Sequence, residues 1–487
     1  MGELPSSWAM TSLGTICSKP QYGWTCKAAK DGELKILRTT DISKPKIDWD
    51  SVPFCEKVPK EVGKYRLEEN DILVSRAGSV GVSCRVTELP HESVFASYLI
   101  RFKSKPGVSP KYLEYYLKSD DYWKSISEFS AGIAVPNVNA SKLSNLPIPL
   151  APDAEQHRIV AKLEKLLAKV DECKERLNKI PFILKRFRQS VLAAACSGQL
   201  TADWRVKIAN PINVYEFIQK IIDKRKELGL KKGEIVYRSN GETPPTWVKA
   251  KLSFFIESMA NGIYKPSEFY SEDGTACLRM YNIQNGEIVW ENLKRMILTK
   301  SELSKYSLQN GDILVNRVNS RELVGKAAII RSVAEPVVFE SKNIRLRLVE
   351  RKIMPIFVNY CFMLRIVRDS FEESAKQTVG MATISQPQIS ELILPIPPIE
   401  EQKEIISRVN GLFRIADEIQ ARYEKAKSHV DHLTQSILAK AFRGELVPQD
   451  PNDEPASELL KRIKAERERS KKEPKAQKGK GSEIKAL

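Results

Sequence analysis

Two long stretches of this chain repeat hydrophobic residues at alternating intervals of four and three positions, and they restrict its fold more than any other feature. The first runs from Ile159 to Val191 and the second from Ile405 to Ile437, at a constant offset of 246 residues. A hydrophobic period of about 3.5 residues, kept over this length, is typical of helices that pair as a coiled coil, and it predicts a left-handed supercoil. We expect the two helices to pair with each other; the alternative is that each belongs to a separate helical bundle. The expected seam residues are Ile159, Leu163, Leu166, Val170, Cys173, Leu177, Ile180, Leu184, Phe187 and Val191 in the first helix, and Ile405, Val409, Leu412, Ala416, Ile419, Tyr423, Ala426, Val430, Leu433 and Ile437 in the second.

The ends of both helices are marked by the same residues. Each begins with Pro-x-x-Glu-Gln, at Pro152 and at Pro398, and acidic residues in a first turn are stabilised by the helix dipole. Each ends near a glycine, Gly198 or Gly444, which is the usual residue beyond a helix C-terminus.

The rest of the chain is duplicated as well. Residues 4–8 match 243–247, residues 71–76 match 312–317, residues 94–101 match 338–345, and residues 146–149 match 394–397. A repeat this long indicates two copies of one domain plus one helix, not a solenoid. Short β-rich runs between Gly, Pro and Asn residues predict mixed strands and helices in each domain.

The predicted fold class is therefore α+β: two mixed α/β globular domains separated by two long helices, which form an antiparallel left-handed coiled coil with a pseudo-two-fold internal repeat. The expected segments are a first domain (1–150), a first coiled-coil helix (151–200), a connecting helical segment (201–242), a second domain (243–397), a second coiled-coil helix (398–446), a C-terminal helix (447–469) and a basic disordered tail (470–487).

Composition points to a polyanionic partner. Lysine and arginine number 78 against 61 acidic residues, a formal net charge of +17, and such an excess favours nucleic acid first and anionic membrane second. The eight cysteines have no Cys-x-x-Cys spacing, which indicates free thiols in a reducing compartment. Because no signal peptide and no bilayer-spanning apolar stretch are recognisable, we expect a cytoplasmic protein.

Catalytic patterns are not found. The sequence has no phosphate-binding glycine loop. Asp153, Glu172 and Lys174 fit a loose nuclease pattern, but the two acids would lie about 28 Å apart on one helix and could not share a metal ion. We therefore expect a chain that catalyses nothing and holds no metal.

The motifs around the two helices resemble those of the specificity subunit of type I restriction–modification enzymes. The most specific are Leu146–Pro149 followed by Glu155 and Gln156, the stretch 180–200, and the stretch 436–446. The resemblance covers residues 4–469. It implies two target recognition domains, each reading one half of a split double-stranded DNA sequence, and antiparallel helices that act as a ruler between them.

The same resemblance implies the partners. Two methyltransferase subunits would dock on the helices, and restriction subunits would join them. S-adenosylmethionine, ATP and magnesium would be bound by those partners and not by this chain, in a complex that acts on adenines of DNA in the cytoplasm, in association with the nucleoid. One alternative is a non-catalytic coiled-coil scaffold with two protein-binding heads, and another is a nuclease or methyltransferase with an unfamiliar site.

Candidate DNA contacts occupy equivalent positions of the repeat. Arg38 and Arg279 each follow a strand-like run that ends in leucine, and Arg76 and Arg317 each follow Asp-Ile-Leu-Val; arginine can bind guanine through two hydrogen bonds in the major groove. Positions where the copies differ should read different bases, and they are Lys27, Thr39, Thr40 and Ser79 in the first copy and Tyr281, Asn282, Asn319 and Arg321 in the second. Gly132 and Gly380 lie in matching turns, where a backbone could approach a phosphate. The alternatives are phosphate contacts or solvated charges, and simple turns for the glycines.

The candidate docking site for partner subunits is the pair of helix ends from Lys185 to Gly198 and from Gln435 to Leu446. They match closely although the globular domains have diverged, which suits one partner bound twice. The candidate contacts are Lys185, Arg186, Arg188, Gln189, Gln435, Ser436 and Arg443.

Overall fold

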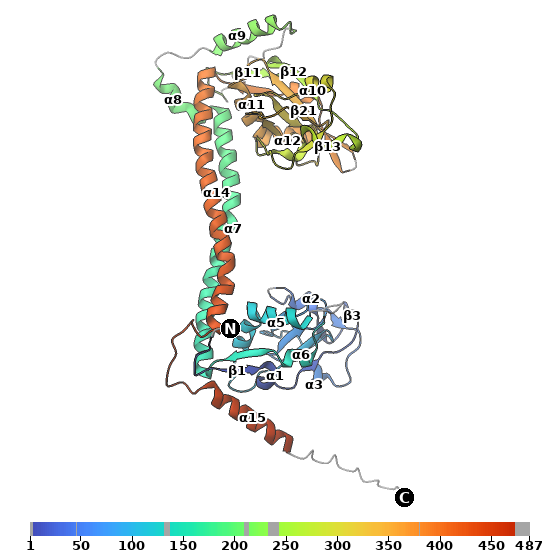
Figure 1. Cartoon of the computed structure of the whole chain (residues 1–487), viewed down its shortest axis with the longest axis vertical. Helices are drawn as coiled ribbons and strands as arrows, with labels where there is room; N and C mark the ends of the chain where they lie inside the picture. The colour runs from blue at the N-terminus through green and yellow to red at the C-terminus, as the bar shows by residue number, and fades with distance from the viewer. Residues whose placement is uncertain are drawn as a thin grey trace. The chain divides into compact units, whose positions relative to one another are not determined.

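The computed structural model describes residues 3–44, 46–130, 137–208, 214–231, 243–378 and 380–472. The chain forms two compact units, one of Met1–Leu177 with Lys425–Leu487 and one of Asn178–Glu424. Each unit contains one globular domain and one half of each long helix (Figure 1).

The globular domain of the first unit is built on three small sheets. Their strand orders are β1-β10, β2-β9-β6-β7 and β3-β5-β4-β8, and β4 and β8 pair in parallel. The strands are β1 (Ala9–Ser12), β2 (Gln21–Tyr22), β3 (Ala28–Ala29), β4 (Lys35–Leu37), β5 (Phe54–Cys55), β6 (Ile72–Ser75), β7 (Ser83–Arg85), β8 (Ser93–Phe95), β9 (Leu99–Phe102) and β10 (Pro147–Leu150). The short helices are α1 (Leu13–Ile16), α2 (Thr39–Ile42), α3 (Val62–Tyr65), α4 (Pro110–Tyr116), α5 (Asp120–Ser130) and α6 (Ala140–Ser144).

The globular domain of the second unit repeats this plan with additional strands. Its sheets have the orders β11-β24, β12-β21-β17-β19, β16-β13-β20, β14-β15 and β18-β23-β22. The strands are β11 (Val248–Lys251), β12 (Ile256–Asn261), β13 (Tyr270–Leu278), β14 (Ile283–Gln284), β15 (Glu287–Ile288), β16 (Lys294–Met296), β17 (Ile313–Asn316), β18 (Val318–Asn319), β19 (Ala327–Ile329), β20 (Val337–Phe339), β21 (Asn343–Leu348), β22 (Lys376–Thr378), β23 (Met381–Thr383) and β24 (Ile393–Ile396). The helices are α10 (Lys300–Tyr306), α11 (Met354–Met363), α12 (Arg365–Ser374) and α13 (Gln386–Ser390).

The sheets confirm the internal duplication strand by strand. The order β2-β9-β6-β7 corresponds to β12-β21-β17-β19, and the parallel pair β4-β8 corresponds to the parallel pair β13-β20. In both domains the first strand pairs antiparallel with the strand that precedes the long helix, as β1-β10 and as β11-β24. The mixed α/β class of each domain was therefore predicted correctly.

The repeated Asp-Ile-Leu-Val motif starts the central strand of each domain. Asp71 is buried and accepts a hydrogen bond of 2.9 Å from the backbone of Glu68, which closes the turn before β6. Its equivalent Asp312 pairs with Arg347 through two contacts of 2.7 Å. Burial raises the pKa of Asp71, although its basic neighbours lower it. The two strands that follow, Ile72–Ser75 and Ile313–Asn316, are buried along their whole length.

The long helices are α7 (Asp153–Ser197) and α14 (Ile399–Phe442), of 45 and 44 residues. They lie side by side within each unit (Figure 1). In the second unit, Arg188 of α7 pairs with Asp417, and the carbonyl of Leu200 just beyond α7 accepts from Arg408, so the two helices run antiparallel there. The glycines that follow them, Gly198 and Gly444, have φ values of 82° and 77°, which residues with a side chain rarely adopt.

The seam between the helices follows the expected residues only in part. Ile159 in the first unit and Ile405 in the second are fully buried, but the prediction is wrong for Cys173, Ile419 and Leu433, which are exposed. In the first unit the next residues, Lys174 and Thr434, face each other instead, with 3.4 Å between Nζ and Oγ1. The contact stripe advances there by four residues where we expected three, closer to the 3.6-residue period of a straight helix. The left-handed supercoil stays a prediction.

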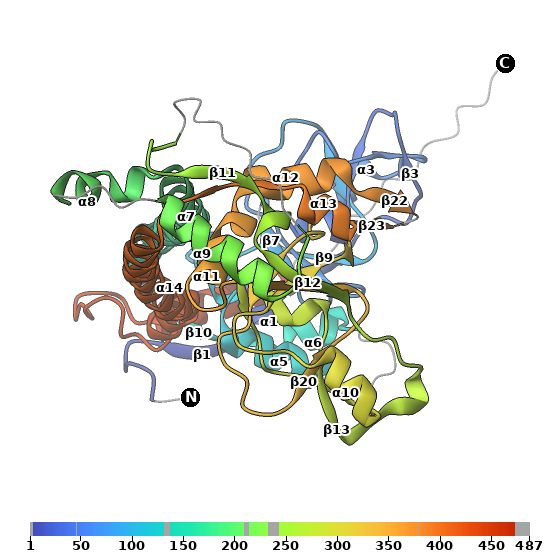
Figure 2. The same ribbon diagram turned by 90° about the horizontal axis from the view of Figure 1, so that it is seen from above.

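Three further helices follow the long ones. In the second unit, α8 (Ala202–Lys207) and α9 (Val214–Glu227) lie in the connecting segment, and α9 lies beside β12, where Arg225 donates to the carbonyl of Ile256 at 3.1 Å (Figure 2). In the first unit, α15 (Ala456–Lys472) packs Leu459 and Ile463 into the core. It extends beyond residue 469, where the tail was expected to begin, and residues 473–487 lie outside the described part of the chain. Among the described residues, no helix is long and apolar enough to cross a membrane.

Candidate nucleic-acid interface

Two of the candidate arginines in the first domain flank one three-residue segment, Ala96–Tyr98, between β8 and β9. The backbone N–H of Ala96 donates to the carbonyl of Leu37 at 2.9 Å, directly before Arg38. The backbone N–H of Arg76 donates to the carbonyl of Tyr98, also at 2.9 Å. The loops that carry Arg38 and Arg76 are therefore fixed to the same segment, although they lie 38 residues apart in the sequence.

The second domain builds the same arrangement around residues 340–342. The N–H of Glu340 donates to the carbonyl of Leu278 at 3.0 Å, directly before Arg279. The N–H of Arg317 donates to the carbonyl of Lys342 at 2.8 Å. We call the two segments, 96–98 and 340–342, the arginine frames of the two domains.

A glycine in each domain lets another stretch of backbone approach its frame closely. A Cβ atom on Gly23 would lie 2.2 Å from the carbonyl oxygen of Phe95, and one on Gly262 would lie 2.1 Å from that of Glu340. Real Cβ atoms do not come this close, so only glycine fits at either position. The backbone on either side of each glycine is thereby held against the arginine frame of its domain.

Arg38 and Arg279 are already paired with carboxylates. Arg38 binds Asp41 through contacts of 3.0 and 2.9 Å, and this hydrogen bonding raises the pKa of Arg38. Arg279 binds Glu340 at 2.9 Å. Their guanidinium groups are oriented by these partners, so each has fewer donors left for a base.

The guanidinium groups of Arg76 and Arg317 form no side-chain hydrogen bond with the described residues. Arg76 lies over the ring of Tyr22, at 5.0 Å from the ring centre, and its Nε is buried without a hydrogen-bond partner among the described residues. Neither Arg76 nor Arg317 forms an ion pair with any residue that the structure describes. Of the four candidate arginines at equivalent positions of the repeat, these two, one per domain, have no carboxylate partner among the described residues.

The remaining candidates divide into exposed and buried residues. Lys27, Thr40, Ser79, Tyr281 and Arg321 are exposed and Thr39 is half-buried, and Arg321 pairs with Glu372 at 3.2 Å. Gly380 lies in an exposed turn with a φ of 75°. Gly132 lies outside the described residues.

Asn282 and Asn319 lie inside the second domain, where we had expected side chains that face DNA. Asn282 is 1% exposed and donates to the carbonyls of Val289 and Glu291. Asn319 is 8% exposed and donates to Oδ1 of Asn316 at 2.6 Å. Both amides hold loops in place, because buried polar groups need hydrogen-bond partners.

Two exposed tyrosines were missed by the sequence analysis. Tyr98 belongs to the first arginine frame and is 60% exposed, and Tyr264, two residues after Gly262, is 77% exposed. Tyr98 directly follows the repeated Val-Phe-x-Ser motif and Tyr264 lies two residues after a glycine, so each had a visible signal in the sequence, but the two tyrosines are not at equivalent positions of the repeat.

The model of the type I restriction modification DNA specificity domain matches this chain twice, at residues 5–181 and 244–427. The chain belongs to the type I restriction–modification specificity family. It is 34% identical to the StySPI specificity subunit of Salmonella potsdam over 487 residues, 96% of each chain. It is 32% identical to the EcoKI specificity subunit of Escherichia coli K12 over 491 residues, 96% of this chain and 97% of the other.

Solved structures show the same fold. A chain from a study of complex assembly and conformational transition in a type I R-M system has a TM-score of 0.63 at 16% identity, covering 91% of this chain and 100% of that one. The HsdS subunit of Thermoanaerobacter tengcongensis has a TM-score of 0.55, also at 16% identity, covering 91% and 98%. Members of this family, the specificity subunits, are in general non-catalytic. The two matches of the family model correspond to the two halves of the duplication, and we call their globular parts the specificity domains.

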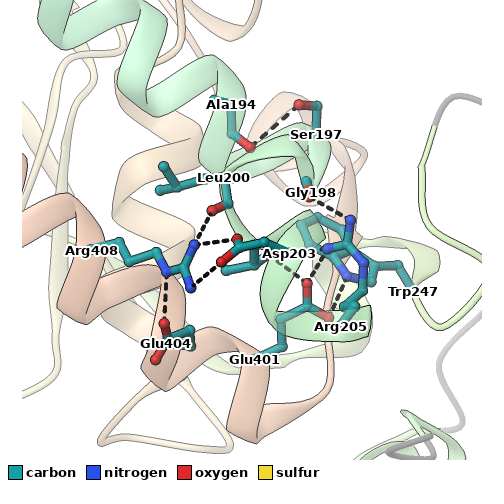
Figure 3. Close-up of polar contacts among 11 residues, drawn as sticks. Ala194, Ser197, Gly198, Leu200, Asp203, Arg205, Trp247, Glu401, Glu404 and Arg408 are labelled. Carbon is teal, nitrogen blue, oxygen red and sulfur yellow. Dashed lines mark hydrogen bonds and ion pairs between the residues drawn. The ribbon is translucent and has the colours of Figure 1, made fainter. Parts of the chain in front are cut away.

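Each specificity domain is joined to the long helices by a buried glutamate. In the second unit, Glu401 of the Pro-x-x-Glu-Gln motif accepts hydrogen bonds from Trp247 at 2.9 Å and Thr201 at 2.7 Å, and it pairs with Arg205 (Figure 3). Arg205 also donates to the carbonyl of Gly198 at 2.6 Å. This cluster connects the first residues of the domain, the start of α14 and the end of α7.

The first unit has a version of this cluster in which both hydrogen-bond donors to the glutamate are uncharged. Glu155 accepts from Trp8 at 3.0 Å and from Gln449 at 2.6 Å. Burial raises the pKa of Glu155. We had assigned the acidic residues of this motif only to the helix dipole; their hydrogen bonds to a tryptophan of the adjoining domain could not be predicted from the spacing.

The candidate docking residues do not share one environment. Lys185, Arg186, Ser436 and Arg443 are exposed. Arg188 pairs with Asp417 at 2.7 Å and lies over Phe413. The side chains of Gln189 and Gln435 donate to backbone carbonyls of the specificity domains, at 3.2 and 3.1 Å.

Proposed function

We propose that this chain is the DNA-reading subunit of a type I restriction–modification complex, with each specificity domain reading one half of a split sequence. The observation that carries the proposal is the arginine frame, which occurs once per domain and presents one arginine that has no acidic partner among the described residues. Family membership supports the same function, because the matching model is that of a DNA specificity domain. The excess positive charge of +17 suits a polyanionic ligand.

The test is equilibrium binding of the full chain, with its methyltransferase partner, to duplexes that carry both half-sites. We expect affinity to fall steeply with salt, because lysine and arginine displace counterions from phosphates. We also expect a duplex with both half-sites at the native gap to bind more tightly than one with either half-site scrambled. Binding that ignores both salt and sequence would favour the scaffold with two protein-binding heads.

Replacement of Arg76 by alanine should weaken recognition of one half-site and leave the other unchanged. A lost bidentate contact with guanine costs about 1–3 kcal/mol. Arg317→Ala is the matched variant in the second domain, and it should affect only the other half-site. Competition among duplexes mutated in one half-site at a time measures both effects, and an equal loss for every sequence would reduce Arg76 to a phosphate contact.

We further propose the partners that such a subunit needs. Two methyltransferase subunits would bind the long helices and carry S-adenosylmethionine for methylation of adenine, and restriction subunits would supply ATP-dependent, magnesium-dependent cleavage. The complex would act in the cytoplasm, on the DNA of the nucleoid. The chain itself would contribute recognition and no catalytic group.

The exposed residues of both helix ends, Lys185 and Arg186 in one and Ser436 and Arg443 in the other, remain the proposed docks. Arg186 lies over Phe182 of its own helix, at 5.8 Å, and forms no ion pair with the described residues. Arg186→Glu should therefore lower the number of bound methyltransferase subunits without disturbing the coiled coil. Arg188→Glu is less informative, because it also breaks the pair with Asp417.

Sedimentation of the complex measures the number of bound subunits. Arg422→Glu is the matched control, since Arg422 is another exposed arginine of the same unit, on α14. Two methyltransferase subunits still bound to the Arg186→Glu variant would place the dock elsewhere.

A further inference from the structure

The two glutamines at the ends of the long helices make the same contact in both units. Nε2 of Gln189 donates to the carbonyl of Met363, the last residue of α11. Nε2 of Gln435 donates to the carbonyl of Lys118, two residues after α4. The glutamines are equivalent at the offset of 246 residues, and the acceptors are equivalent in the alignment of α4 with α11.

The two carbonyl groups that accept these bonds, of Met363 and Lys118, lie at or just beyond the C-terminal end of a helix. Met363 is the last residue of α11, and the last carbonyls of a helix have no donor within the helix; Lys118 lies in the turn beyond α4, where its carbonyl also belongs to no helix. A side-chain amide from a neighbouring helix supplies the missing N–H. The contact therefore fixes one end of α4 or α11 against one position along a long helix.

The residues around each glutamine form a matched apolar contact. Leu192, Ala195 and Cys196 of α7 correspond to Leu438, Ala441 and Phe442 of α14, and all six are buried in the cores of their domains. Phe442 packs against the rings of Tyr112 and Tyr116, with centres 5.2 and 5.1 Å away. In the second unit, Cys196 lies 3.6 Å from Cys361 between the two sulfur atoms, at the positions equivalent to Phe442 and Tyr116.

These contacts account for the similarity of the two helix ends. The similarity suggested a site for one partner bound twice. On this face, however, the end of α7 packs against the second specificity domain and the end of α14 packs against the first. Packing of apolar side chains is non-directional and tolerates sliding, whereas a hydrogen bond depends on distance and angle. In both units the glutamine adds a hydrogen bond within this apolar contact, near the end of the long helix, apart from the hydrogen bonds that Glu155 and Glu401 accept at the start of the helices.

We propose that Gln189 and Gln435 are positioning residues that fix each specificity domain along the long helices and thereby hold the two half-site readers to one DNA gap. The inference rests on the proposed function. It predicts that loss of both hydrogen bonds relaxes the choice of gap length and leaves the reading of each half-site intact.

The experiment compares two double variants of the full chain that differ in one property. Gln189→Glu with Gln435→Glu removes both N–H donors and places a negative charge beside a backbone carbonyl oxygen in each unit. Gln189→Lys with Gln435→Lys keeps an N–H donor for each carbonyl oxygen, and a charged donor strengthens such a hydrogen bond. Both are compared with the unmodified chain, after circular dichroism has established that their helix content is the same.

The measured quantity is the ratio of affinities for duplexes with the native gap and with gaps one base pair longer or shorter. Since one hydrogen bond contributes about 0.5–1.5 kcal/mol, or roughly twofold to tenfold in affinity, the glutamate variant should lose a factor of this size in the ratio. The lysine variant should recover the ratio of the unmodified chain. Affinity for a duplex with a single half-site should be the same in all three.

The outcomes separate this inference from the function on which it rests. If the unmodified chain has no preference for a split duplex, the proposed function fails. If it has a gap preference and the glutamate variant retains that preference, only the positioning role is wrong. Equal losses on every duplex, including single half-sites, would also overturn it, since the glutamines would then support the fold and not the spacing.

Discussion

Adding one heptad to each long helix is expected to lengthen the preferred DNA gap by about three base pairs. Seven residues add about 10.5 Å of helix, and about 3.4 Å of duplex corresponds to one base pair. The sequence pattern places suitable insertions near Glu172 and near Glu418. The structure refines this choice, because Lys174 and Thr434 face each other in the first unit, and heptads added directly after Lys174 and directly before Thr434 would lie opposite one another.

Duplex twist adds a second expectation for this variant. Three further base pairs rotate the second half-site by about 100°, given roughly 10.5 base pairs per turn. We therefore expect a lower affinity at the new optimum than that of the unmodified chain, unless the DNA or the domains twist to compensate.

Affinity is measured over duplexes whose gap grows one base pair at a time. A single heptad in α7 alone is the control, because it breaks the pairing without lengthening both helices. A folded double-insertion variant that still prefers the original gap would show that the helices do not set the spacing.

Glu401→Ala is expected to destabilise the second unit by about 3–5 kcal/mol, the usual cost of removing one partner of a buried ion pair. The Glu401 side chain is 2% exposed, and its loss leaves Arg205, which is 22% exposed, without its carboxylate. It also leaves the ring N–H of Trp247 without an acceptor.

Glu155→Gln should lower the free energy of unfolding far less, by about 1 kcal/mol or below. Both donors to Glu155 are uncharged, and an amide oxygen can accept a hydrogen bond from either of them. Glu400→Ala is the control within the same turn of α14, since Glu400 is half exposed and pairs with the exposed Lys403. Urea unfolding followed by circular dichroism ranks the three variants. Similar costs for Glu401→Ala and Glu400→Ala would mean that the buried cluster contributes little.

The sequence predicted the architecture well because the architecture is periodic. Residue spacings that are visible along the sequence predict the long helices, the glycines at their ends and the duplicated mixed domains. The prediction of the seam was wrong at Cys173, Ile419 and Leu433. The contact between two helices shifts by a fraction of a residue in each turn, and the hydrophobic pattern alone does not show that shift.

The candidate site was predicted less completely, for a physical reason. Whether an arginine side chain is available to bind DNA depends on other side chains of the fold that approach its guanidinium group. Arg38 and Arg76 look alike in the sequence, but only Arg38 has an aspartate three residues later that turns back to bind it. Glu340, which binds Arg279 in the second domain, lies 61 residues away and had no visible connection to it.

The most direct test of the account is a map of methylated adenines in cells that produce this chain together with its methyltransferase partner. The account predicts methylation at one split sequence with a fixed gap, and it predicts that Arg76→Ala relaxes one half of that sequence while Arg317→Ala relaxes the other. Methylation at an unsplit sequence, or at the same sites when this chain is omitted, would contradict it.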